Sequence, residues 1–204
     1  MQTLKPISTI SYNTETFLKS VLDRLIKEHI IDYYMYIPHI GELDFEGKKE
    51  DDHTHLFIIP NKRINTAELG DFFIEPDPTN DLPLKCMTWN TSKSDDWILY
   101  DLHDEKYLMS KMETRQIHYK YEDLRSSDYQ DLRRRYRMAY QSSGYARACN
   151  LYEYARSGGS LNDLMRIGAV PINQVEQYDY FFKKAKQDIL YKDINTEKGP
   201  SDRT

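Results

Sequence analysis

Residues 30–38 read IIDYYMYIP and residues 53–60 read HTHLFIIP, and these are the two clearest strand signals in the chain. Both are rich in isoleucine and in aromatic or other apolar residues, and both end at a proline, a pattern typical of buried strands. Residues 6–12 alternate and contain β-branched side chains, and residues 84–89 form a further short apolar run. We therefore expect four strands.

The segments between and after these strands have apolar residues at helical intervals. Thr14 precedes apolar residues at helical intervals through Ile26, and residues 66–73 have the pattern of a short helix. Residues 95–112 also follow a helical rather than an alternating pattern. The order β-α-β-β-α-β-α predicts an α+β domain in which helices pack on a ferredoxin-like antiparallel sheet.

The sequence changes character after residue 128, where strand signals end. Residues 129–156 predict one long helix that stops at Ser157-Gly158-Gly159. Ser160 and Asp163 form a capping-box signature for a short helix ending at Gly168, and another periodic stretch follows Pro171. We expect an α+β domain at residues 1–128, a small helical module at 129–190 and a disordered tail at 191–204.

Charge is unevenly distributed along the chain. The net charge of -5 argues against a nucleic-acid partner, because affinity for phosphate rests on lysine and arginine. Residues 39–105 contain six basic and sixteen acidic residues, which suits the surroundings of a cation. Residues 133–156 contain six arginines and a single acid, Glu153. If DNA is bound, we expect phosphate contacts from this stretch, chiefly from Arg133, Arg134, Arg135 and Arg137.

Features of membrane and secreted proteins are missing from the sequence. No apolar run approaches the roughly 18 residues needed to cross a bilayer, and residues 1–6 lack the pattern of a signal peptide. Cys86 and Cys149 lie far apart and match neither a metal-binding nor a redox spacing. We expect a cytoplasmic protein that does not enter a membrane and has two ordinary buried thiols.

Three of the six histidines lie close to the predicted strand ends. His53 and His55 are two apart on one strand, so both imidazoles point to one face and can bind one ion. Such a pair alone also fits solvated histidines at a strand edge. The preceding strand, however, ends near His39 and Glu42, which adds a third imidazole and a carboxylate. This set predicts a metal site.

These motifs resemble the HUH-type replication initiators (Rep proteins) of rolling-circle plasmids and related phages. In that family a His-hydrophobic-His pair on a central strand and a His-x-x-Asp/Glu element after the preceding strand hold Mn²⁺ or Mg²⁺, and a tyrosine on a downstream helix attacks DNA. HTHLFIIP, PHIGE and WILYDLH match these elements over roughly residues 7–125, with Thr54 in place of the hydrophobic residue. The resemblance implies the HUH nuclease fold, and metal ligands His39, Glu42, His53 and His55, with Asp44 as an alternative acid.

The resemblance also implies that Tyr100 is the nucleophile. Its attack would leave a 5′-phosphotyrosine and a free 3′-OH that primes synthesis, and the covalent link would allow the ends to be rejoined. Tyr107, two turns later on the same predicted helix, is a rival or a second nucleophile. His103 would assist proton transfer or bind phosphate, although a core or surface histidine is an equal alternative.

The resulting expectation is a replication initiator that nicks single-stranded origin DNA. The chain lacks the Walker-type phosphate-binding motif, so a helicase would be a separate partner, as would a host DNA polymerase, and oligomerisation stays open. One alternative is a non-catalytic nucleic-acid-binding module on a ferredoxin-like sheet in which aromatic side chains stack on bases, the candidates being Tyr33, Tyr34, Tyr36 and Phe57. Another is a structural protein whose histidines bind nothing.

Overall fold

The computed structural model describes residues 2–43, 48–79, 81–91, 97–109, 115 and 117–166, and seven residues between 175 and 187. Gly168 and the expected tail at 191–204 lie outside these residues, as does most of the stretch that follows Pro171. Among the described residues, none of the helices has the length and apolar character needed to cross a membrane.

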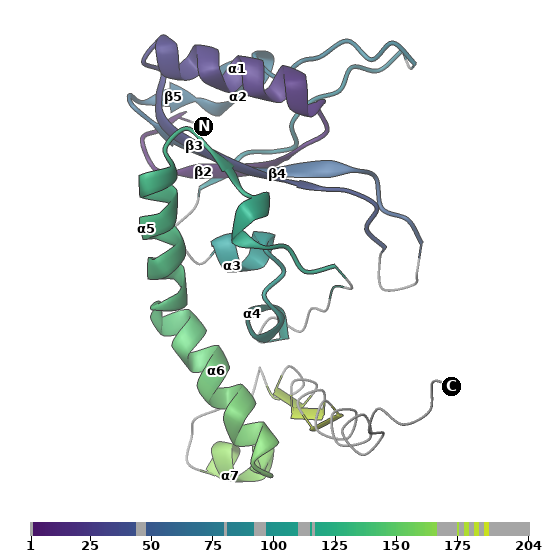
Figure 1. The fold of residues 1–204 in the computed structure, drawn as a ribbon, viewed down its shortest axis with the longest axis vertical. Helices are drawn as coiled ribbons and strands as arrows, with labels where there is room; N and C mark the ends of the chain where they lie inside the picture. Colours follow the sequence, from purple (N-terminus) through teal and green to yellow (C-terminus); the bar gives the residue numbers. More distant parts are fainter. Residues whose placement is uncertain are drawn as a thin grey trace, which may run out of the picture.

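The centre of the fold is a five-stranded antiparallel sheet (Figure 1). Its strands lie in the order β6 (Asn90–Thr91), β2 (Ile7–Ser11), β4 (His53–Pro60), β3 (Ile31–His39) and β7 (Arg125–Ser126). A separate two-stranded sheet joins β1 (Gln2–Thr3) to β5 (Ile64–Asn65). The expected α+β class is confirmed, and the two longest strands, β3 and β4, are neighbours.

Helices cover both faces of the sheet (Figure 1). On one face lie α1 (Glu15–Lys27) and α2 (Thr66–Asp71); on the other lie α3 (Trp97–Asp101) and α5 (Tyr129–Tyr140), with α4 (Glu105–Met109) beyond α3. A 3₁₀ turn (Tyr121–Asp123) precedes β7, and α6 (Ser143–Arg156) and α7 (Leu161–Arg166) extend away from the sheet.

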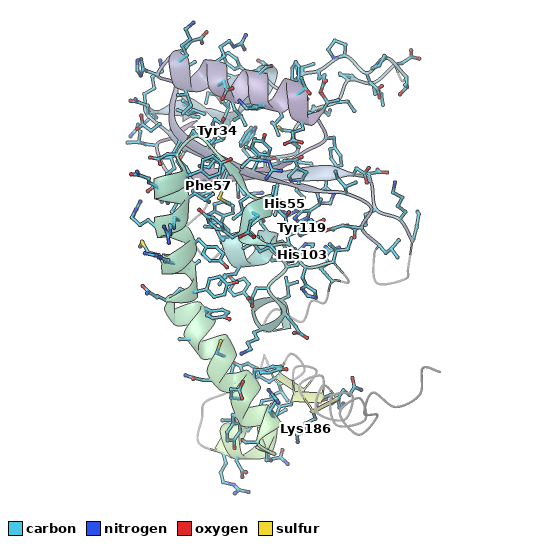
Figure 2. The ribbon with its side chains drawn as sticks, in the orientation of Figure 1. Tyr34, His55, Phe57, His103, Tyr119 and Lys186 are labelled. Atoms are coloured by element: carbon cyan, nitrogen blue, oxygen red, sulfur yellow. The ribbon has the colours of Figure 1, made fainter. Side chains whose placement is uncertain are left out.

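Side chains along each strand point alternately to the two faces of the sheet, and each face has its own hydrophobic core. Tyr34, Leu56 and Ile58 pack with the buried side of α1, whereas Met35 and Phe57 pack with α3 and α5. Figure 2 shows Tyr34 and Phe57 on opposite sides of the sheet, with His55 on the side of Phe57. The two-residue period of a strand therefore places His53 and His55 on the face covered by α3 and α5.

Residues 84–89 do not form the expected regular strand. Leu84 pairs with Glu75 and Cys86 pairs with Ser11, each as an isolated bridge, and only β6 at 90–91 joins the sheet. The apolar run divides its pairing between two partners, so no continuous ladder forms.

The helix expected at 95–112 is interrupted between α3 and α4. His103 has a φ of 53°, and the N–H groups of His103 and Asp104 donate to the carbonyls of Tyr100 and Leu99. This is a Schellman motif, which usually has glycine at the left-handed position. Histidine visits that conformation more readily than most residues, but its side chain gave no stop signal in the sequence.

The long helix expected at 129–156 is two helices. Gln141 is the C-cap of α5, and Ser142 caps α6, because the Ser142 hydroxyl accepts a hydrogen bond from the N–H of Tyr145. Leu132 and Ala139 of α5 belong to the same core as Phe57, so the domain boundary expected at residue 128 divides one core. A smaller cluster joins α6 and α7 to Tyr178 and Phe182. The start of α7 at Leu161, with Ser160 as its cap, agrees with the prediction.

Candidate metal centre

Three histidine side chains meet where β3 and β4 end beside each other. His39 pairs with His53 across the two strands, and Ile37 pairs with His55. One ring nitrogen from each of the three histidines lies within 4.8 Å of the other two. Thr54 points to the opposite face and is buried there, so it does not approach the cluster.

Hydrogen bonds orient the two histidines of β4 toward each other. Nδ1 of His53 donates to the carbonyl of Asp51 at 2.8 Å, and Nδ1 of His55 donates to the carboxylate of Asp101 at 2.8 Å. The two Nε2 atoms then face each other at 3.3 Å. In neutral rings both carry lone pairs, so a proton or a metal ion has to lie between them. Ligands about 2.1 Å from one ion and about 90–110° apart are separated by about 3.0–3.4 Å, which matches.

His39 directs the lone pair of its Nδ1 toward Glu42. Its Nε2 donates to the carbonyl of Asp101 at 2.8 Å, which leaves Nδ1 unprotonated. Burial, together with the neighbouring histidines, lowers the pKa of His39 to about 2. The 3.3 Å contact between Nδ1 and Oε1 of Glu42 is therefore no ion pair but two acceptors facing each other. Nδ1 is buried and has no hydrogen-bond partner among the described residues.

Glu42 brings a carboxylate over His39. Gly41, with a φ of 72°, turns the chain back after β3, and its N–H donates to Asp52. Only glycine adopts this conformation without strain. Glu42 is 4% exposed, and its Oε2 lacks a hydrogen-bond partner among the described residues. Nδ1 of His39 and Oε2 of Glu42 are thus two buried acceptor atoms without a hydrogen-bond donor among the described residues, and a cation would fit beside them.

The donor set fits a metal ion. Three overlapping groups have suitable geometry: His39 with His53 and His55, His39 with Glu42 and His103, and Glu42 with Glu50 and His53. The four ligands expected from the sequence, His39, Glu42, His53 and His55, all belong to these overlapping groups, although no single group contains all four. Asp44, the alternative acid, lies outside the described residues.

Asp101 was missed by the sequence analysis, although it orients two of the histidines. Its carboxylate accepts from His55 and its backbone carbonyl accepts from His39, both at 2.8 Å. That carbonyl belongs to the last turn of α3 and has no partner inside the helix. Burial works to lower the pKa of His55, but the charge and hydrogen bond of Asp101 raise it above its ordinary value. No spacing rule identifies Asp101, because the rotation of α3 decides where it points.

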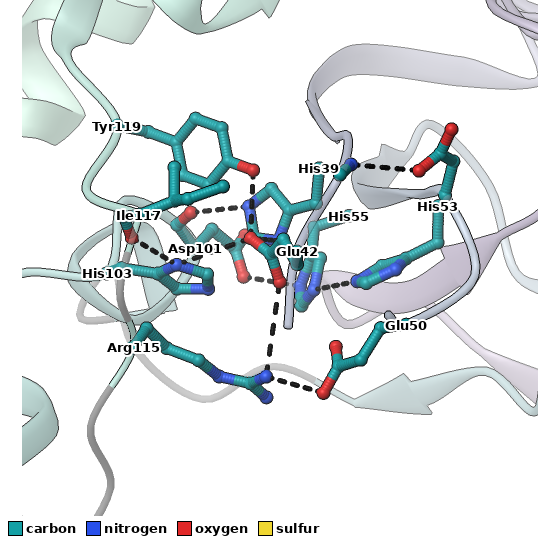
Figure 3. A network of polar contacts seen from close by, with 12 residues as sticks. His39, Glu42, Glu50, His53, His55, Asp101, His103, Arg115, Ile117 and Tyr119 are labelled. Atoms are coloured by element: carbon teal, nitrogen blue, oxygen red, sulfur yellow. Dashed lines mark hydrogen bonds and ion pairs between the residues drawn. The ribbon is translucent and has the colours of Figure 1, made fainter. Parts of the chain in front are cut away.

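Tyr119 and Arg115 were also missed, and both contact Glu42 (Figure 3). The hydroxyl of Tyr119 donates to Oε1 of Glu42 at 2.8 Å, and its ring stacks on His39 with a centroid separation of 4.3 Å. Arg115 forms an ion pair with Glu50 at 2.7 Å and lies 4.0 Å from Oε2 of Glu42. Both residues follow α4 and reach the site only through the tertiary fold.

The two candidate nucleophiles differ in their surroundings. Tyr100 is half-buried, and its ring centroid lies 6.2 Å from that of the histidine His55. Tyr107 is buried in the core beside Leu99 and Leu132, on the far side of the turn that ends α3. The two tyrosines therefore do not share a face of one helix, and Tyr100 is the one beside the histidines.

His103 lies within the buried network and is 2% exposed. Its Nδ1 donates to the carbonyl of Ile117 at 2.9 Å and lies 3.4 Å from Oε1 of Glu42. Burial lowers its pKa, against the opposing effects of Ile117 and Glu42. His103 was expected to be either a catalytic or phosphate-binding residue or a core or surface histidine. Its position favours the core histidine, because the ring is shielded from solvent and lies against the carboxylate of Glu42.

The four arginines of α5 fall into two groups. Arg133, Arg134 and Arg137 are exposed. Arg135 lies over the rings of Tyr33 and Phe57, at 5.1 and 5.8 Å from their centroids, and pairs with Asp131 at 2.6 Å. Arg135 therefore helps to pack α5 on the sheet, and its role as a DNA-binding side chain stays a prediction.

The aromatic side chains proposed as a stacking surface for a non-catalytic module are inside the protein. Each is at most 4% exposed: Tyr33, Tyr34, Tyr36 and Phe57. Their burial in the two cores removes the observation on which that alternative depended.

The comparisons with known proteins found no match to this sequence, either among the models of protein families or among the curated proteins. The interpretation of the site therefore rests on its own geometry.

Proposed function

We propose that this protein is an HUH-type, metal-dependent endonuclease with the corresponding nuclease fold. It would nick single-stranded origin DNA to start rolling-circle replication and could rejoin the ends. One observation carries the proposal: the imidazole nitrogens of His39, His53 and His55 converge beside Glu42, and Tyr100 lies next to His55. A metal-binding group with a neighbouring tyrosine is what phosphodiester cleavage by a tyrosine requires.

The ligand set favours Mn²⁺ over Mg²⁺ as the resident ion. Mg²⁺ prefers oxygen ligands, whereas three imidazoles and one carboxylate also suit Mn²⁺. The residues that would hold it are His39, His53 and His55 with Glu42. When bound, the ion supplies Lewis-acid polarisation of the scissile phosphate and offsets the charge on its oxygens.

Tyr100 would perform the covalent step. Its phenolic oxygen forms a bond to phosphorus as the bond to the 3′ oxygen breaks, the phenolic proton is lost, and the 3′ oxygen gains a proton to become the free 3′-OH. Burial lowers the pKa of Arg115 while Glu50, Glu42 and the charge of Tyr100 raise it, with a net rise. In this proposal the guanidinium group of Arg115 offsets negative charge that develops on the Tyr100 oxygen.

The decisive experiment is a search for the covalent adduct. The protein is incubated with Mn²⁺ and pooled single-stranded oligonucleotides, and denaturing gels report protein-linked DNA. We expect adduct with the wild type and none with Tyr100→Phe, because phenylalanine keeps the ring but lacks the nucleophilic oxygen. Tyr107→Phe is the matched control and should still form adduct. Adduct from a variant in which both tyrosines are phenylalanine would overturn the assignment.

A further inference from the structure

Among the described helices, none contributes to a core cluster with β2 on the sheet face that carries the histidines. Ile7, Thr9 and Ser11 of β2 point to the α1 side and are buried, whereas Ser8 and Ile10 point to the histidine side and are only half-buried. The helices α3 and α5 pack on β3 and β4 and leave this side of β2 accessible. Tyr12, directly after β2, is 37% exposed.

Strand register places Tyr12 beside a candidate metal ligand. Ile10 pairs with His55 and Ser11 pairs with Thr54, so the next position opposite Tyr12 is His53. The ring centroids of Tyr12 and His53 are 6.4 Å apart. His53 thus has His39 on one side and Tyr12 on the other. His53 is partly exposed while His39 is buried, so the cluster is more open to solvent on the side of His53, which Tyr12 borders.

Met87 and Lys85 complete a small surface around Tyr12. The Tyr12 hydroxyl contacts the sulfur of Met87 at 3.7 Å, and the N–H of Met87 donates to the carbonyl of Ile10 at 2.8 Å. Met87 is 52% exposed. Lys85 is exposed too, and its carbonyl accepts from the N–H of Tyr12. We call Tyr12, Lys85 and Met87 the Tyr12 platform.

We propose that the Tyr12 platform binds a nucleobase of single-stranded DNA, from a nucleotide adjacent to the scissile phosphate. The inference rests on the proposed function, because the histidine cluster fixes where the phosphate lies. An exposed aromatic ring stacks on any base, and a methionine beside it adds polarisable contact area. Lys85 provides a positive charge for the backbone in an otherwise acidic part of the chain. The platform therefore sets how the strand enters the site.

The test compares two ligands of equal length and charge: oligo-dT and an oligomer of abasic deoxyribose phosphate. Affinities are measured by fluorescence anisotropy with Mn²⁺ in a Tyr100→Phe background, which prevents cleavage. Adding Tyr12→Ala should weaken oligo-dT binding by roughly 5- to 150-fold, the usual range for one stacked base. It should leave the affinity for the abasic oligomer unchanged. Tyr12→Phe should bind both ligands like the Tyr100→Phe parent.

Ile74→Ala is the matched control, since Ile74 is 49% exposed and lines a pocket on the α1 side with Phe17 and Phe72. It should change neither affinity. Equal losses for oligo-dT and the abasic oligomer, or no loss for oligo-dT, would overturn the platform and leave the proposed function standing. Failure of the Tyr100→Phe parent to bind either ligand would instead overturn the proposed function.

Discussion

Asp101 connects the histidine cluster to the proposed nucleophile. Its carboxylate holds His55, its carbonyl holds His39, and Tyr100 is the preceding residue on α3. A carboxylate that orients a metal-binding histidine fixes both its tautomer and its ring position. One helix end therefore determines the direction of two ligands and the place of the tyrosine.

Asp101→Asn should weaken Mn²⁺ binding by about 10- to 100-fold, because an amide does not enforce the Nδ1–H tautomer of His55 as a carboxylate does. Isothermal titration measures the affinity. Asp104→Asn is the control: Asp104 accepts from the N–H of Tyr107 and the hydroxyl of Tyr140, away from the histidines. If both variants bound Mn²⁺ equally well, Asp101 would have no role in positioning.

At the scale of elements, the two faces of α5 have different surroundings. Its inner face packs Leu132, Ala139 and Arg135 against the sheet. Its outer face presents Arg133, Arg134 and Arg137 to solvent, although Arg134 also pairs with Asp131. A run of arginines on a helix therefore contains both structural and surface side chains, and only the latter can contact phosphate.

We expect replacement of Arg133 and Arg137 with alanine to weaken DNA binding and to flatten its salt dependence, by a slope of roughly 0.7 to 0.9 for each phosphate that the protein no longer neutralises.

Arg135→Ala should instead lower the free energy of unfolding by about 1–3 kcal/mol, because it removes a partly buried cation–π contact and one of the positive charges that pair with the Asp131 carboxylate. Salt titrations of binding and urea unfolding separate the two effects. An unchanged salt slope in the double variant would make the outer face a solvated surface.

For the whole molecule, the strand order brings the candidate metal ligands together. The candidate ligands come from the ends of β3 and β4 and from the chain between them, while Asp101 and Tyr119 come from segments packed over that end (Figure 3). An ion bound there joins parts that separate on unfolding. An ion that binds only the native state raises the free energy of unfolding by mass action.

Mn²⁺ at about 100 times its dissociation constant should therefore raise the free energy of unfolding by about 2.7 kcal/mol. Thermal unfolding in Mn²⁺ and in a chelator measures the change. Alanine at both His53 and His55 should abolish it. A stabilisation that persisted in this double variant would place the ion elsewhere.

Much of the local structure could be predicted from the sequence, because it depends on neighbours along the chain. Thr14 caps α1, as its side chain and the following apolar spacing indicate. The two-residue period of β4 puts His53 and His55 on one face whatever lies opposite. The gathering of His39 and Glu42 with them followed from two strands that are close in the chain and pair antiparallel.

Only the tertiary structure decided which distant residues complete the site. Asp101, Arg115 and Tyr119 lie 46 or more residues beyond His55, and their approach depends on the rotation of α3 and on the path after α4. The break at His103 depends on a left-handed residue that is not glycine, so composition could not reveal it. Arg135 differs from Arg133 only in which face of α5 meets the sheet. Periodicity specifies faces, but packing between elements specifies what each face contacts.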